Sequence, residues 1–269
     1  MKKLFKSICP PFIWSMLQEL KHKNMFFGVH QTFDQVLDEK PWEGGGWDQL
    51  QRNKMSELIP ATNTTKVFIP EPIPNGYIVT PCLIVNMLSA KGKCRVLDFA
   101  GGNGFTYYRI QSYLTSLPNV DWHVVDSNET GLEFGKNFSL KDNHIRFSNC
   151  LPNSDSIQYD VLYINTSLQY IEDYQSLLRE LLLYNPIFLV FTRLLAGEIE
   201  PYVTSQDVMG KRTPCKFINI DRFSRFLESQ GYKLIFKSPT EEILQDYFDG
   251  VPDNFKIPFS LTLVYTKNN

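Results

Sequence analysis

The stretch VLDFAGGNGFTYY, residues 96–108, limits what this chain can fold into more than any other part of the sequence. An apolar run leads into a cluster of small residues, and a row of aromatic residues follows that cluster. Glycine adopts backbone conformations that other residues avoid, and it lets a ligand approach the backbone closely. Ligands of open α/β sheets bind beyond the carboxyl ends of the strands. The stretch therefore predicts a buried strand, a ligand-binding turn and a helix, in that order.

The chain after residue 90 continues this alternation of apolar runs and helical patterns. We expect strands at 95–100, 121–126, 144–147, 159–165, 186–193, 231–237 and 259–267. We expect helices between them at 105–117, 129–138, 172–184 and 220–230. Such alternation forms right-handed units on a parallel sheet, and apolar strands suit a sheet that is covered on both faces. The sequence therefore predicts an α/β, Rossmann-like fold, and it assigns no element to residues 194–215.

The first 90 residues do not show this regular alternation of strands and helices. We expect residues 1–90 to form an N-terminal helical or irregular cap segment, and residues 91–269 to form the α/β domain. Helical patterns in the cap lie at 12–23, from Thr32 or Asp34 to a stop at Lys40-Pro41, and at 78–90.

The first twenty residues combine lysines with an apolar stretch that Pro10 and Pro11 interrupt. This pattern fits an ordinary surface helix, and it also fits a peripheral membrane contact through residues 1–20. No window approaches the ~20 apolar residues of a membrane span. We therefore expect a cytoplasmic protein, with a peripheral position at the inner face of the membrane as the alternative.

Charge and cysteine content narrow the class of partner. The chain has 27 basic and 29 acidic residues, whereas nucleic-acid-binding domains usually carry a basic excess. Nucleic acid is therefore disfavoured as the main partner. None of the five cysteines forms a C-x-x-C pair, so we interpret them as reduced thiols and expect no metal site.

The glycine cluster fits two classes of ligand. A dinucleotide fingerprint, G-x-G-x-x-G, needs a third glycine for close packing of helix on strand, and Tyr107 stands in its place. S-adenosylmethionine needs a loop that passes close to its methionine and ribose parts. Asp98 could meet its ammonium group, and Asp126, 22 residues after Gly104, could accept hydrogen bonds from both ribose hydroxyls. The second ligand is favoured.

These residues resemble motif I of the class I S-adenosylmethionine-dependent methyltransferases. The family pattern is Asp/Glu-x-Gly-x-Gly-x-Gly, and Asp98, Ala100, Gly102 and Gly104 take its four named places, with Ala100 as a departure. The resemblance covers about residues 90–267 and implies a seven-stranded sheet with an antiparallel last strand. It also implies S-adenosylmethionine as the cofactor. The cofactor-binding residues that we predict are Asp98, Ala100, Gly101, Gly102, Asn103, Gly104, Asp126, Asn149 and Asn165.

More narrowly, the chain resembles an uncharacterised bacterial group whose members are often encoded among surface-polysaccharide genes. The segments that carry this resemblance are LDFAGGNG, WHVVD, 166–173, 191–193, 202–232 and 28–37. The resemblance implies methyl transfer to a small or carbohydrate-linked acceptor, such as a sugar hydroxyl or a phosphate-type oxygen, in surface glycan or capsule biosynthesis. The alternatives are a non-catalytic interaction protein of a polysaccharide assembly system and an NAD(P)-dependent oxidoreductase.

The loops after the fourth and fifth strands should form the acceptor pocket. After the fourth come neutral hydrogen-bonding residues, among them Gln169 and Tyr170, and the Asn/Asp-Pro-Pro-Tyr/Phe signature of enzymes that methylate nucleic-acid amino groups is absent. Thr166 and Ser167 could equally cap a helix. After the fifth comes Arg193, which could bind a phosphate or carboxylate, or form a surface ion pair with Glu198 or Glu200.

Histidines are candidates for a general base. His30 belongs to the segment that is expected to cover the pocket, and it is the best candidate. His123 lies inside a predicted strand and is better explained as a hydrogen-bonded core residue. Our catalytic candidates are therefore His30, Arg193 and Tyr170. Trp42, Trp47 and Tyr77 flank turns and could form a lid or pack in the core.

Overall fold

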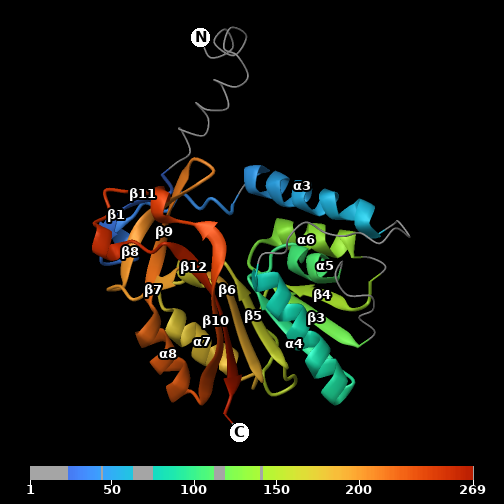
Figure 1. Ribbon diagram of the computed structural model, residues 1–269. Helices are drawn as coiled ribbons and strands as arrows, with labels where there is room; N and C mark the ends of the chain where they lie inside the picture. Colours follow the sequence, from blue (N-terminus) through green and yellow to red (C-terminus); the bar gives the residue numbers. More distant parts are fainter. Residues whose placement is uncertain (1–23, 44, 63–74, 112–118, 140–141, 269) are drawn as a thin grey trace, which may run out of the picture.

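A computed structural model describes residues 24–43, 45–62, 75–111, 119–139 and 142–268. A seven-stranded sheet, β10-β12-β6-β5-β2-β3-β4, forms its larger part (Figure 1). Neighbours from β4 to β6 are parallel, and β12 is antiparallel to both of its neighbours. The predicted fold class is therefore confirmed. The strands are β2 (Cys94–Phe99), β3 (Val120–Val125), β4 (Ile145–Ser148), β5 (Val161–Asn165), β6 (Phe188–Leu194), β10 (Tyr232–Ile243) and β12 (Phe259–Lys267).

Helices cover both faces of this sheet, because each strand alternates apolar side chains between two cores. On one face, strand residues such as Val96 pack with the helices α4, α5 and α6. On the other face, neighbours such as Leu97 pack with α7 and α8. The helices are α4 (Asn75–Lys91), α5 (Phe105–Gln111), α6 (Glu129–Phe138), α7 (Tyr174–Leu182) and α8 (Ile220–Ser229).

A second, smaller sheet was not predicted from the sequence. Its order is β11-β1-β8-β9-β7. The segment to which the sequence assigned no element supplies most of it, because β8 and β9 form a hairpin. Met209 and Gly210, both with positive φ, make its two-residue turn, and two such residues match the twist of paired strands. The strands are β1 (Phe26–His30), β7 (Ala196–Gly197), β8 (Tyr202–Val208), β9 (Lys211–Asn219) and β11 (Phe248–Asp249).

The expected helix from Thr32 or Asp34 to Lys40 is wrong. Only a short 3-10 helix, η1 (Phe33–Gln35), forms there, and Val36 is already extended. The Glu39 nitrogen donates instead to the Arg212 carbonyl of β9, and Asp38 accepts a hydrogen bond from Thr213, so contacts with β9 outweigh a weak helical pattern. The helix that was predicted at 12–23 and the membrane contact of residues 1–20 lie outside the described residues.

Two long helices precede β2. The helix α3 (Gly45–Thr62) lies over α5 and α6, at the edge of the large sheet where its parallel strands end (Figure 1). The helix α4 packs on β2, β6 and β10, so part of the predicted cap segment belongs to the core of the large sheet. The division into two domains at residue 90 stays a prediction.

Candidate cofactor site

The turn between β2 and α5 carries the unusual backbone that the glycine cluster predicts. Ala100, Gly102 and Gly104 have φ values of +56°, +59° and +78°. For alanine the left-handed region costs roughly 1–2 kcal/mol. A hydrogen bond of 2.7 Å from the Ala100 nitrogen to the Val125 carbonyl helps to hold that residue in place. Ala100 therefore occupies the same left-handed region as its glycine neighbours, although it departs from the motif.

Gly101 and Gly104 are needed for space. A Cβ on Gly101 would lie 2.5–2.7 Å from the carboxyl atoms of Asp98, and one on Gly104 would lie 2.8 Å from Cδ1 of Ile145. Carbon atoms do not approach other heavy atoms this closely. The turn therefore wraps tightly around the Asp98 carboxyl group.

Asp98 is fully buried at the end of β2. Its Oδ2 accepts a hydrogen bond of 3.0 Å from Nε1 of Trp122, whereas its Oδ1 has no hydrogen-bond partner in the described part of the chain. Burial raises the pKa of Asp98 to about 7, the Trp122 hydrogen bond lowers it, and the charge of Asp126 raises it further. An unpartnered buried carboxyl oxygen suits a cationic or hydrogen-bond-donating ligand group.

Asp126 follows β3, and its carboxylate accepts hydrogen bonds from the loop after β2 and from the loop after β3. Its Oδ2 accepts a hydrogen bond of 2.8 Å from the Gly102 nitrogen, and its Oδ1 accepts one of 2.8 Å from the Asn128 nitrogen. Asn128, and not Asp126, caps α6, because its side chain accepts from the Gly131 nitrogen. A carboxylate has about four acceptor positions, so two remain for ligand hydroxyls.

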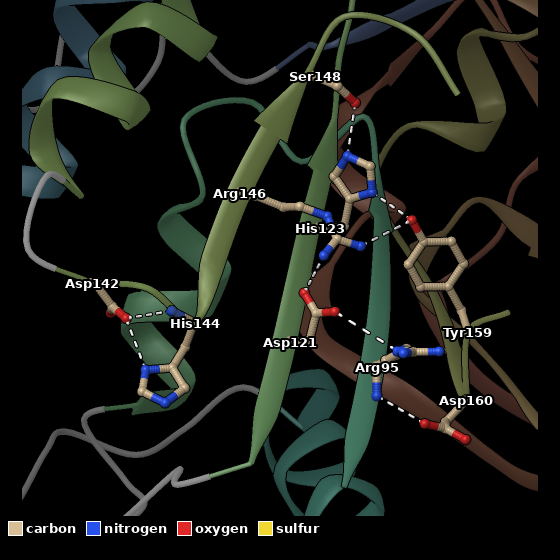
Figure 2. Close-up of polar contacts among 9 residues, drawn as sticks. All are labelled: Arg95, Asp121, His123, Asp142, His144, Arg146, Ser148, Tyr159 and Asp160. Atoms are coloured by element: carbon tan, nitrogen blue, oxygen red, sulfur yellow. Dashed lines mark hydrogen bonds and ion pairs between the residues drawn. The ribbon is translucent and has the colours of Figure 1, made fainter. Parts of the chain in front are cut away.

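The loop after β4, which holds the predicted ligand residue Asn149, is fixed by a polar network (Figure 2). His123 binds the Tyr159 hydroxyl through Nδ1 and Ser148 Oγ, 2.8 Å away, through Nε2. Ser148 donates its own hydrogen to the Cys150 carbonyl, so Nε2 of His123 must carry the proton. Burial lowers the pKa of His123 to about 4. The prediction of a hydrogen-bonded core histidine is confirmed.

Charged residues continue this network across β2, β3 and β4. Arg146 donates to Asp121 at 2.6 Å, and Nε of Arg95 lies 3.8 Å from the same carboxylate (Figure 2). Between β4 and β5 the chain forms turns and no helix, so this part of the sheet face lacks a helical cover and carries ion pairs. The network therefore supports the strands that end at the glycine turn and at Asp126.

The end of β5 carries Asn165, whose Oδ1 accepts hydrogen bonds from two threonine hydroxyls. Thr166 Oγ1 lies 2.9 Å away and Thr192 Oγ1, on β6, lies 2.8 Å away. Thr166 has a φ of +58°, which sets it apart from an ordinary helix cap. These bonds fix the side chain of Asn165 at the same edge of the sheet as Asp98.

An aromatic cluster joins the cap segment to this edge. The ring centroid of Trp42 lies 4.8 Å from that of Trp47 and 4.8 Å from that of Tyr170. The Trp42 carbonyl accepts a hydrogen bond of 3.1 Å from Asn128. The side chain of Tyr77, the third residue of the predicted lid, is outside what the structure describes. Trp42 and Trp47 therefore lie beside the cofactor loops.

A second hydrogen bond ties the cap to the glycine turn. Nδ2 of Asn103 donates to the Gln51 carbonyl of α3 at 3.3 Å, while Oδ1 accepts from the Phe105 nitrogen at 3.2 Å. Asn103 is 1% exposed. The predicted cofactor residue thus stabilises the turn and anchors the covering helix.

Neutral acceptors follow β5 in the short 3-10 helix η2 (Leu168–Tyr170). Oε1 of Gln169, a residue that is 2% exposed, and Oγ of Ser167 are buried and have no hydrogen-bond partner within the described ranges. Ser167 makes no capping hydrogen bond, so a cap does not explain it. The Tyr170 hydroxyl donates to Oε1 of Gln206 at 2.9 Å, and burial holds the pKa of Tyr170 well above its usual value.

The other two catalytic candidates lie on β1 and on β6. His30 ends β1, pairs with Val203 of β8, and turns its ring towards Gly28. Arg193 is exposed on β6 with a φ of +55°. Glu200, one of its two expected partners, pairs with Arg222 at 2.9 Å. The catalytic roles of His30, Arg193 and Tyr170 stay predictions.

Comparisons with known proteins find similar structures but no similar sequences. No protein-family model matches the sequence, and no curated protein sequence matches it. A solved Listeria monocytogenes protein described as an S-adenosylmethionine-dependent methyltransferase is similar in structure, with a TM-score of 0.50 and 13% identity over 72% of this chain and 99% of that one. Burkholderia thailandensis 1,6-didemethyltoxoflavin-N1-methyltransferase, solved with S-adenosylhomocysteine, gives a TM-score of 0.49 and 12% identity over 90% and 100%.

The large sheet has the class I methyltransferase fold. The Listeria monocytogenes structure supports this assignment, as does the strand order with its one antiparallel strand. Among the helices that the structure describes, none has the length and apolar character needed to cross a membrane. Trp122 and Gln206 were missed as site residues, because each contacts the site through a partner that is distant in the sequence.

Proposed function

We propose that this protein is an S-adenosylmethionine-dependent methyltransferase that acts on a small-molecule acceptor. One observation carries the proposal: a left-handed glycine turn, an unpartnered buried carboxyl oxygen and a strand-end aspartate meet at the carboxyl edge of a class I methyltransferase sheet. Asp98 and Asp126 supply acceptors for an ammonium group and for ribose hydroxyls. Gly102, where an added Cβ would meet no atom within 4 Å, leaves room for the ligand at the backbone.

The site residues fit the cofactor, and most of the catalysis would come from position. When bound, S-adenosylmethionine supplies a methyl group on a sulfonium, ready for in-line displacement by a nucleophile. The protein contributes by holding the acceptor in line with that group. The rings of Trp42 and Tyr170 pack against each other beside the cofactor loops. The hydrogen bond from Thr192 to Asn165 holds these two side chains in place at the ends of β5 and β6.

The acceptor that we propose is carbohydrate-linked, with a sugar hydroxyl or a phosphate-type oxygen as the methylated atom in surface glycan biosynthesis. The buried oxygens of Gln169 and Ser167 can accept hydrogen bonds from hydroxyl groups. Aromatic rings such as Trp42 offer a flat apolar surface to a sugar ring. Arg193 would bind an anionic group, and His30 would serve as the base if one is required.

We also propose that the protein is cytoplasmic and that residues 1–20 contact the inner face of the membrane. This contact would bring the enzyme to glycan precursors that are held there. The support is the lysine-rich and apolar character of these residues in the sequence.

Calorimetric titration with S-adenosylmethionine and S-adenosylhomocysteine tests the cofactor. We expect micromolar binding that Asp126→Ala abolishes and that Glu133→Ala, an exposed acid on α6, leaves intact. Transfer of a labelled methyl group to nucleotide-linked sugars and phosphorylated glycan precursors then tests the acceptor. Absence of binding by the folded wild type would refute the methyltransferase proposal and favour a non-catalytic interaction protein.

The oxidoreductase alternative is disfavoured by Tyr107. Its side chain is fully buried in the place of the third glycine, and its hydroxyl donates to Asp142 at 2.8 Å. In the dinucleotide fingerprint that glycine lets the helix pack closely on the strand, whereas here an aromatic ring fills the space between them. Titration with NADH, followed by cofactor fluorescence, tests this alternative directly.

A further inference from the structure

Trp122 is a buried polar contact of the cofactor site. It lies on β3, is 1% exposed, and donates its indole hydrogen to Oδ2 of Asp98, 24 residues earlier in the chain. Tyr107 and Tyr163 pack against its ring, with centroid distances of 5.7 and 6.1 Å. These neighbours leave the ring little freedom, so the direction of its N–H is fixed by packing.

The two oxygens of Asp98 have different surroundings. Trp122 satisfies Oδ2, while Oδ1 is buried and has no hydrogen-bond partner among the described residues. A buried polar atom without a partner costs stability, and in native proteins it usually has a reason. The turn at Gly101 wraps around this carboxyl group and continues to Gly102, which Asp126 holds. The unpartnered oxygen therefore belongs to the site where the cofactor would bind.

We propose that Trp122 is a positioning residue, which fixes one oxygen of Asp98 so that the other receives the ammonium group of S-adenosylmethionine. The inference rests on the proposed function and deepens it. An indole donor that binds one oxygen keeps the carboxyl plane in a single orientation, so the second oxygen is aimed before the ligand arrives. This lowers the ordering cost of binding.

The arrangement couples cofactor binding to proton release. Of the described residues, Asp126 is the charged group that acts on Asp98, and it disfavours the ionised form, while the two tyrosines that pack against Trp122 carry no charge. Because burial raises the pKa of Asp98 to about 7, about 0.9 of the molecules are protonated at pH 6. When the ammonium group binds, the O–H bond of Asp98 breaks, the proton passes to the buffer, and the carboxylate pairs with the ammonium.

Calorimetry of the full-length protein at pH 6.0, in two buffers of different ionisation enthalpy, measures the protons that are released. The probes are S-adenosylhomocysteine and 5′-methylthioadenosine, which lacks the amino and carboxyl groups. We expect release of about 0.9 proton with the first probe, none with the second, and none with either in Asp98→Asn. Affinity for S-adenosylhomocysteine should rise with pH through the range in which Asp98 ionises.

The variant Trp122→Phe tests the positioning role. We expect about tenfold weaker binding of S-adenosylhomocysteine at pH 7, a pH midpoint that moves upwards, and an affinity for 5′-methylthioadenosine within about twofold of wild type. The midpoint moves because the lost hydrogen bond favours the ionised carboxyl. An unchanged pH profile in Trp122→Phe would overturn the inference.

Wild type and Asp98→Asn keep the inference testable if Trp122→Phe does not fold. Binding of S-adenosylhomocysteine by wild type without proton release would overturn the inference and leave the proposed function intact. No binding of either probe by wild type would refute the proposed function, and the inference with it.

Discussion

Replacing Asp98 by asparagine should stabilise the protein while it weakens cofactor binding. The carboxyl group is fully buried, and burial raises its pKa from 3.8 to about 7. An acid with a raised folded-state pKa holds its proton more tightly in the folded state, so its stability contribution falls as the pH rises from about 4 to about 7. Asparagine is close in shape, can still accept from Trp122, and does not ionise.

The magnitude follows from the two pKa values. At pH 5 the ionisation of Asp98 favours the unfolded state by about 1.7 kcal/mol, and at pH 8 by about 4 kcal/mol. The free energy of unfolding of Asp98→Asn, relative to wild type, should therefore increase by about 2.5 kcal/mol between pH 5 and pH 8. Any fixed cost of the new amide group cancels in this comparison.

Urea unfolding of both proteins at pH 5, 6, 7 and 8, followed by circular dichroism, measures this difference. Glu133→Gln, an exposed substitution on α6, is the parallel variant that controls for the handling of each sample. Stability curves of wild type and Asp98→Asn that run parallel from pH 5 to pH 8 would refute the reasoning. In that case the carboxyl group is better solvated than its burial indicates.

Three further substitutions test the same site. Gly101→Ala places a Cβ within 2.7 Å of the Asp98 carboxyl, so thermal unfolding should shift downwards and calorimetry should show no binding of S-adenosylhomocysteine. Ala100→Gly relieves the φ of +56° and should raise the free energy of unfolding by up to about 1 kcal/mol with unchanged affinity. Gln169→Leu removes a buried unpartnered oxygen together with a side-chain hydrogen bond to Tyr170, so the two effects on stability should largely offset and cofactor affinity should remain, while transfer to an acceptor found by the screen should fall at least tenfold.

The large sheet could be predicted because its signals are local. Each strand from β2 to β6 except β4 is a short, mainly apolar run, and all five were placed within about two residues of their observed bounds. The small sheet could not be predicted in this way, because β1 pairs with β8, more than 170 residues later, and with β11. The hairpin turn at Met209-Gly210 was the one local signal for it, and this turn lacks the Asn-Gly or Asp-Gly pair that marks the common type.

In the candidate cofactor loop, too, features that depend on nearby residues could be predicted and contacts between distant residues could not. The glycine turn and the strand-end Asp126 could be predicted from spacing alone, and the structure joins them with a hydrogen bond from the Gly102 nitrogen to the Asp126 carboxylate. Trp122 could not be recognised, because on an apolar strand a tryptophan is first interpreted as core. Only the pairing of Asp98 with Val124 in adjacent strands brings the indole beside the carboxyl group.

Ala100 shows why a departure from a sequence motif needs a structural explanation. Ala100 departs from the glycine pattern of motif I, yet its backbone has the left-handed φ that glycine would adopt. The cost of roughly 1–2 kcal/mol is of the same order as one buried hydrogen bond, and the Ala100 nitrogen makes such a bond to Val125. Because the loss falls on stability and leaves the shape of the turn unchanged, alanine is compatible here with the cofactor site. At Gly101, where a Cβ would collide with Asp98, it is not.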